Sequence, residues 1–283
     1  MQNVRQKYYP TILQAIHLLI LYLFIQTVVD FPLALIDYYN GTDYLYHPVK
    51  KVLLGVGSTL FILIYGFRKS KAPFNKVFPL RIFNPLILIP LFTFFWGAHN
   101  LLEEVNIAIE KVIPAPPWFW ELFTNIFESD FGWWGAFMKV AIVAPVVEEL
   151  IFRGLIFQGF RRNYNNFVAV IMSAILFSLF HLNPWQMPAT FVLGILLGWL
   201  MIRTQNLILA ILAHSLNNLL VLFIVTFWSD INTFALFLMD KKESLTLSSF
   251  LVVFSLILIY LLSLWPKKKS NPISRSNVAI TFL

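Results

Sequence analysis

Two adjacent glutamates, Glu148 and Glu149, lie in the middle of a long apolar run, residues 133–160, and Arg153 follows them in the same run. A carboxylate or a guanidinium at the centre of a membrane helix costs roughly 2.5 to 3.5 kcal/mol on insertion scales. Three such groups in one segment therefore need compensation, and groups kept at this cost usually belong to a functional site. The pattern indicates acid–base chemistry inside a membrane.

The spacing predicts different roles for the two glutamates. Glu149 and Arg153 are four residues apart with the acid first, the favourable orientation for an ion pair on one helix face. Glu148 is rotated by about 100° on the same helix and has no such partner nearby in the sequence. We expect Glu149 to be ionised and structural, and Glu148 to be free to exchange a proton as a general base.

Two histidines and an asparagine in neighbouring apolar segments have depths that overlap that of Glu148. Counting 1.5 Å per residue from the predicted cytoplasmic helix ends places Glu148, His181 and His214 roughly 18, 21 and 11 Å deep. His214 and Asn218 are four residues apart, so both side chains can donate to one point and stabilise an oxyanion. His181 can hold a water molecule together with Glu148. Each polar residue alone could simply hydrogen-bond to a neighbouring helix, but their co-occurrence at one depth favours a functional site.

The rest of the chain predicts the elements that position these residues. The sequence is 59% hydrophobic and 12% charged, whereas soluble domains carry about 25% charged residues. Apolar segments near the roughly 20 residues that cross a bilayer recur eight times. They are residues 11–29, 52–67, 85–98, 133–160, 167–182, 190–202, 207–228 and 247–265. The predicted fold class is all-α: a single transmembrane domain, residues 1–283, built as a bundle of about eight helices.

The distribution of charge predicts the orientation of this bundle, because Lys and Arg near span ends accumulate on the cytoplasmic side. With the N-terminus inside, the cytoplasmic segments carry fourteen of the 21 basic residues. Both termini are therefore predicted to be cytoplasmic. The net charge of +7 then faces anionic lipid headgroups, and no nucleic-acid partner is needed to explain it. The oligomeric state is left open.

Several further features limit the chemistry. The chain has no cysteine, which excludes disulfides, thiolate catalysis and cysteine metal ligands. The remaining histidines, His17, His47 and His99, are expected to be structural or solvent-facing. The first segment, residues 11–29, is expected to be a retained anchor because no small-residue cleavage pattern follows it.

Two more segments carry structural expectations. The interruption at residues 100–132 is rich in aromatic side chains, which predicts an interfacial helix; a lid or substrate-guiding element is the alternative. Gly194 and Gly198 form a small-xxx-small pair, which we expect to allow close packing within the bundle, with dimerisation as the alternative.

Residues 144–154, APVVEELIFRG, resemble the first motif of the CAAX protease and bacteriocin-processing (CPBP or Abi) intramembrane proteases: two glutamates, three variable positions and an arginine. Phe177 to His181 matches the second motif, and His214 to Asn218 matches the third. The three motifs occur in order in adjacent segments, within a proposed catalytic core at residues 132–228.

The resemblance implies an eight-helix membrane endopeptidase that forms no covalent acyl-enzyme and needs no cofactor. Glu148 and His181 would activate the attacking water, and His214 with Asn218 would form the oxyanion hole. Glu149 and Arg153 would support the site. The substrate would be a membrane protein or peptide. Eukaryotic relatives trim prenylated proteins, and prokaryotic relatives are linked to peptide maturation and bacteriocin immunity, so the substrate is left open.

Two alternatives use the same side chains. A zinc ion held by Glu148, His181 and His214 would make a metalloprotease, although no HExxH helix is present. A membrane immunity protein, binding protein or proton-coupled carrier would use the polar groups as a ligand site or proton path. A carrier usually shows repeat symmetry, and the sequence shows none. The expected location is a multi-pass position in a prokaryotic inner or plasma membrane.

Overall fold

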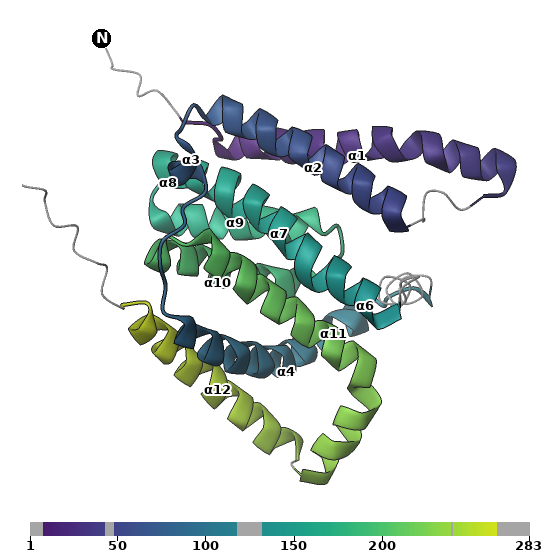
Figure 1. Cartoon of the computed structure of the whole chain (residues 1–283). Coiled ribbons are helices and arrows are strands. Elements are labelled where there is room, and N and C mark those ends of the chain that lie inside the picture. The colour runs from purple at the N-terminus through teal and green to yellow at the C-terminus, as the bar shows by residue number, and fades with distance from the viewer. Residues whose placement is uncertain (1–7, 43–47, 118–131, 239, 265–283) are drawn as a thin grey trace, which may run out of the picture.

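The computed structural model describes residues 8–42, 48–117, 132–238 and 240–264, and within these ranges the chain is almost entirely helical (Figure 1). The elements are α1 (Ile12–Asn40), α2 (Pro48–Ser70), α3 (Phe74–Val77), η1 (Pro85–Ile87), α4 (Leu88–Val112), α6 (Gly132–Ala136), η2 (Phe137–Val143), α7 (Ala144–Glu149), η3 (Leu150–Ile156), α8 (Phe157–Asn163), α9 (Asn166–Phe180), α10 (Met187–Thr204), α11 (Leu207–Leu238) and α12 (Lys241–Leu262). Both η2 and η3 are π-helical, and η1 is a 3₁₀ turn.

The prediction of an all-α, polytopic membrane protein is confirmed. Five helices are long and apolar enough to cross a membrane: α1, residues 85–112, α10, the first part of α11, and α12. The other three predicted segments also form helices beside these five, in α2, in the composite helix of residues 132–163, and in the 15-residue α9. Five rather than eight helices therefore meet the spanning criterion among the described residues.

The helices pack as pairs around a central group. In Figure 1, α1 and α2 form one side of the bundle and α4 with α12 forms the opposite side. Between them, α9 lies along α10, and α11 packs against η2 and α7. The central segments thus come from the region that carries the three motifs.

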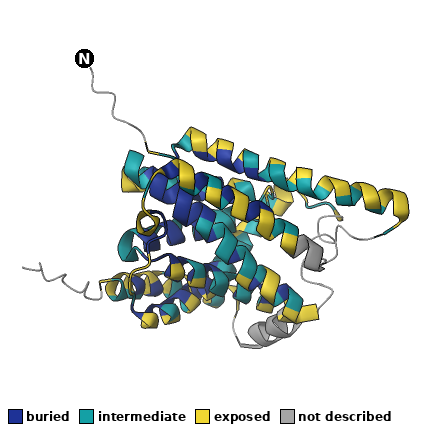
Figure 2. Cartoon of the chain, turned by 45° about the horizontal axis from the view of Figure 1, so that its top comes forward, coloured by how far each residue is buried: buried dark blue, intermediate teal, exposed yellow. Residues whose placement is uncertain are grey.

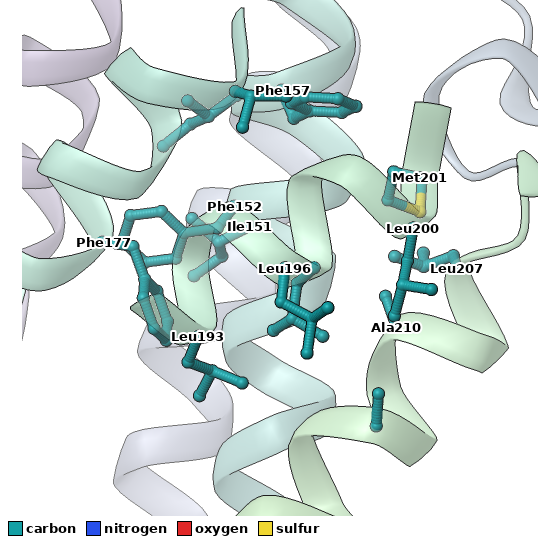
Figure 3. Close-up of a cluster of buried hydrophobic side chains, with 14 of the residues drawn as sticks. Ile151, Phe152, Phe157, Phe177, Leu193, Leu196, Leu200, Met201, Leu207 and Ala210 are labelled. Atoms are coloured by element: carbon teal, nitrogen blue, oxygen red, sulfur yellow. The ribbon is translucent and has the colours of Figure 1, made fainter. Parts of the chain in front are cut away.

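A core of large apolar side chains fills this centre. Figure 3 shows Phe152 and Phe177 near Leu193 of α10, with Phe157 in the same cluster on the neighbouring helix. All three phenylalanines are fully buried. Many apolar side chains on α1 and α12 are instead exposed (Figure 2), for example Phe24 and Phe250. Lipid tails are the natural surroundings for such outward apolar faces.

The paired glycines of α10 pack against α9, as expected for contacts within the bundle. A Cβ atom on Gly194 would lie 2.9 Å from the Cα of Ala174, and one on Gly198 would lie 3.3 Å from Val170 Cγ1. The absence of side chains at these positions lets the two helices approach closely. This close approach positions the carbonyl group of Gly194 for a role in the site.

Local signals set several helix ends. Thr11 and Gln14 form a capping box at the start of α1, and Gly41 ends this helix in the left-handed conformation. The side chain of Asn165 caps α9, and that of Asp240 caps α12. These caps satisfy backbone N–H groups that a helix start leaves without partners.

One end of the bundle gathers eight of the described basic residues. Hydrogen bonds join Tyr8 to Asn163 and Arg203 to Ser263 at this end, and Leu207 donates its N–H to the carbonyl of Pro79. The basic side chains here are Arg68, Lys69, Lys71, Lys76, Arg81, Arg161, Arg162 and Arg203. Their common location agrees with the predicted loop arrangement, while the cytoplasmic orientation of this end stays a prediction.

Some expectations lie outside the described residues. They concern His47, the terminal basic residues, and residues 118–131 of the aromatic segment.

Candidate active site

The structure brings Glu148, His181 and His214 together from three helices. Glu148 lies in α7, His181 directly follows α9, and His214 lies in α11. Oε2 of Glu148 is 4.0 Å from Nε2 of His181 and 4.0 Å from Nε2 of His214. This oxygen is buried and has no hydrogen-bond partner within the described residues. The two imidazoles therefore face one unpaired carboxylate oxygen.

Glu149 makes the predicted pair with Arg153 and also makes a contact with His214 that the sequence did not predict. Its Oε1 accepts from Arg153 Nη1 at 3.1 Å and from His214 Nδ1 at 2.9 Å. Because a carboxylate oxygen only accepts, this contact assigns a proton to Nδ1 of His214. The opposite ring nitrogen then faces Glu148. Glu149 thus orients the imidazole as well as compensating the arginine.

Arg153 is fully buried and has three partners. Besides Glu149, its Nη2 donates to the carbonyl of Gly194 at 3.3 Å, and the guanidinium lies 4.5 Å from the ring centre of Phe177. A buried guanidinium is tolerated when charge, hydrogen bonds and an aromatic face replace its hydration. The arginine therefore ties η3 to α9 and α10 behind the site.

Phe177 organises both histidines. Its carbonyl oxygen lies 2.8 Å from Nδ1 of His181. Because a carbonyl oxygen only accepts, Nδ1 carries a proton and donates it, and Nε2 is the ring nitrogen that faces Glu148. Its ring meets His181 at a centroid distance of 4.9 Å and His214 at 5.6 Å, both edge-on. The phenylalanine of the second motif thus fixes the orientation of each imidazole.

Asn218 lies one turn beyond His214, and its amide is tied on both sides. Nδ2 donates to the carbonyl of Val140 at 2.9 Å, and Oδ1 accepts from Nδ2 of Asn217 at 3.0 Å. The first of these bonds uses one of the two N–H groups of the amide. The second N–H group is left for a ligand.

The backbone explains why the carbonyl of Val140 accepts a side chain. In η2 the hydrogen bonds join residues five apart, as from the N–H of Ala144 to the carbonyl of Lys139. The next donor in this series would be residue 145, but Pro145 has no N–H. The carbonyl of Val140 is thereby released and Asn218 satisfies it. Short π-helical stretches inside α-helices are frequent at functional sites.

Two residues near the site, Tyr22 and Asn217, were not assigned a role from the sequence. Tyr22 of α1 hydrogen-bonds to Thr59 of α2 at 2.7 Å and stacks on Phe180, next to His181. Asn217 of α11 donates from its Nδ2 to Oδ1 of Asn218. His99, which is expected to be structural, lies beside Asn217. No pattern in the sequence points to Tyr22, because its contacts are entirely tertiary.

The side chains divide into an accessible and a sealed group. Glu148 and His181 have about a fifth of their side-chain surface exposed, at 22% and 21%, whereas Glu149 and Arg153 have none. Within the described parts of the chain, no three His, Asp or Glu side chains have a geometry that could hold a metal ion. The accessible group can contact a substrate, and the sealed group can only position it.

Comparison with known proteins agrees with the three motifs. Residues 130–220 match the family described as Type II CAAX prenyl endopeptidase Rce1-like. The UPF0177 protein YajF of Lactococcus lactis is 28% identical over 57% of this chain and 79% of its own length. The CAAX prenyl protease 2 of Arabidopsis thaliana is 34% identical over 55% of this chain and 56% of its own length. No solved structure gives a significant match.

These matches confirm the family resemblance and support a membrane protease in general. Together with the five apolar helices, they also confirm the predicted location: the chain is a multi-pass membrane protein with bacterial relatives.

Proposed function

We propose that this protein is an intramembrane endopeptidase that hydrolyses a peptide bond of a membrane-associated protein or peptide. The observation that carries the proposal is the unpaired Oε2 of Glu148, which lies 4.0 Å from the Nε2 atoms of His181 and His214. A separation of 4.0 Å is too long for a direct hydrogen bond and is suited to a bridging water. Glu148 and His181 would hold and activate this water.

The reaction would proceed by general base catalysis. Glu148 accepts a proton from the water while its oxygen attacks the carbonyl carbon of the peptide bond. The carbonyl oxygen becomes an oxyanion, stabilised by Nε2–H of His214 and the second amide N–H of Asn218. When the C–N bond breaks, the protonated Glu148 returns its proton to the leaving amine. The water thus supplies one oxygen of the new carboxyl group and, through Glu148, one hydrogen of the amine.

The contact between Glu149 and His214 supports this use of the imidazole. Nδ1 of His214 already donates to Glu149, so a second proton on Nε2 makes the ring an imidazolium. The buried carboxylate of Glu149 stabilises that positive charge. His214 could then donate to the oxyanion while Glu149 holds it in place.

The direct test is cleavage of a candidate substrate by purified wild-type protein and by Glu148→Gln. We expect the variant to lose activity, because an amide cannot accept the proton of the water. Full activity in Glu148→Gln would refute the proposal. We also expect His214→Ala to lower kcat more than it raises KM, because the oxyanion exists only near the transition state. Weakened binding with unchanged turnover would contradict this role.

The alternatives have their own measurements. Metal analysis of chelator-treated protein tests a zinc enzyme, since a zinc requirement would appear as lost activity restored by the metal. A binding or immunity protein would keep full cellular function in Glu148→Gln. Both outcomes differ from the one expected for a metal-free peptidase.

A further inference from the structure

A groove separate from the candidate active site lies between the start of α1 and the end of α2. Its volume is about 670 Å³, and basic, aromatic and apolar side chains line it. The basic ones are Arg68, Lys69 and Lys71, from the last turn of α2 and the residues that follow it. The groove therefore opens at the basic end of the bundle.

The lining is divided along the helix axis. Ile64 and Phe61 precede Arg68 by four and seven residues, which is roughly 6 and 10 Å along α2. Both apolar side chains are about half exposed, at 51% and 54%. The groove thus combines a cationic mouth with an apolar strip that continues toward the middle of α2.

Among the described residues, the three cations have no acidic partner. The sequence contains no Asp or Glu before residue 30 or between residues 44 and 102. Within the described residues, no carboxylate lies within ion-pair distance of Arg68, Lys69 or Lys71. The dipole at the C-terminal end of α2 supplies only about half a negative charge. The mouth of the groove therefore carries an uncompensated positive charge.

Aromatic rings hold one of these cations without neutralising it. Nζ of Lys69 lies 5.7 Å from the ring centre of Tyr9 and 5.1 Å from that of Tyr65. Burial, with a smaller effect of Tyr65, raises the pKa of Tyr9 to about 12, so its hydroxyl stays neutral at physiological pH. Cation–π contacts fix the ammonium position and leave its charge available to a ligand.

We propose that this groove binds one anionic phospholipid, with its phosphate at Arg68, Lys69 and Lys71 and one acyl chain along Phe61 and Ile64. The occupant follows from charge complementarity and from the order of the two zones. A phospholipid has an anionic headgroup next to an apolar chain, and the groove presents matching surfaces in the same order. A soluble phosphate would use the cations and leave the apolar strip uncovered.

The test measures lipid binding by the purified full-length protein in neutral detergent micelles, titrated with fluorescent phosphatidylglycerol. The variant is Arg68→Gln/Lys69→Gln. The matched control is Lys76→Gln/Arg81→Gln, which removes two exposed cations from the same end but outside the groove. All four side chains are exposed, and thermal unfolding in neutral micelles checks that both variants fold.

We expect the groove variant to raise the dissociation constant roughly 30-fold, because each basic group near an anionic lipid contributes about fivefold. The control should stay within about twofold of wild type. Equal losses of lipid affinity in the groove variant and the control would mean that the basic surface as a whole attracts the lipid, and would overturn the proposal. Equal competition by glycerol phosphate or inorganic phosphate would also overturn it. The measurement needs no substrate, so it is independent of the proposed peptidase activity.

Discussion

Replacing Glu149 by glutamine should lower the stability of the fold, whereas replacing Glu148 by glutamine should lower activity and leave stability nearly unchanged. Glu149 joins Arg153 and His214 through one oxygen, and none of the three side chains is more than 3% exposed. Glu148 is 22% exposed and makes no hydrogen bond within the described residues. Replacing either carboxylate by an amide is nearly isosteric. A difference in stability between Glu148→Gln and Glu149→Gln therefore results from the different surroundings of the two carboxylates, and not from a change in side-chain size.

The expected loss of stability in Glu149→Gln is about 3 kcal/mol. Removing one partner of a buried ion pair costs about 3 to 5 kcal/mol, because the other charge is left uncompensated. The side-chain amide oxygen in the Glu149→Gln variant can still accept one hydrogen bond, so we expect a loss at the lower end of this range. Glu148→Gln should change stability by less than about 1 kcal/mol, since it breaks no hydrogen bond. Its effect should appear in activity alone.

The assay is reversible unfolding in mixed detergent and SDS micelles, followed by circular dichroism. About 3 kcal/mol corresponds to a change of more than roughly hundredfold in the folding equilibrium. If Glu149→Gln does not fold, the double variant Glu149→Gln/Arg153→Met provides a second measurement. It removes both charges and should be more stable than Glu149→Gln alone. Equal stability losses in the two single variants would refute the division of roles.

Two further predictions concern the elements around the site. Pro145→Ala restores an N–H group that can bind the carbonyl of Val140, so it should release the amide of Asn218 and lower kcat roughly tenfold without loss of stability. Unchanged kcat in this variant would contradict the explanation of the Asn218 contact. Gly194→Ala brings a Cβ atom to 2.9 Å from Ala174 and should destabilise the fold by about 1 to 3 kcal/mol, measured in the same unfolding assay. A stability equal to wild type would mean that the two helices separate without penalty.

Local features of the site could be predicted from the sequence because helix geometry is local. The four-residue spacing of Glu149 and Arg153 was sufficient to predict their ion pair, which the structure contains at 3.1 Å. The overlap of Glu148, His181 and His214 followed from counting residues along predicted helices. The contact between Glu149 and His214 could not be predicted in this way. It depends on the rotation of α11 relative to α7, which tertiary packing sets.

Helix lengths were underestimated where charged residues continue an apolar segment. The segment predicted at residues 85–98 extends to Val112, although Glu103, Glu104 and Glu110 lie in the added part. The first helix likewise runs past Asp30 to Asn40. Hydropathy identifies only the apolar part of a helix. The helical backbone hydrogen bonds continue through charged residues until a capping residue or a change in backbone conformation ends the helix. The π-helical stretches were also missed, because their register depends on contacts such as Asn218 with Val140.

The most direct test of the account is a comparison of membrane and secreted peptides between cells that carry the wild-type protein and cells that carry Glu148→Gln. Mass spectrometry of peptide termini detects new ends that result from hydrolysis. The account predicts that at least one membrane-associated substrate loses its cleaved form in Glu148→Gln cells, with the uncleaved form accumulating. Identical termini in both cells, at equal levels of folded protein, would contradict a peptidase that depends on Glu148.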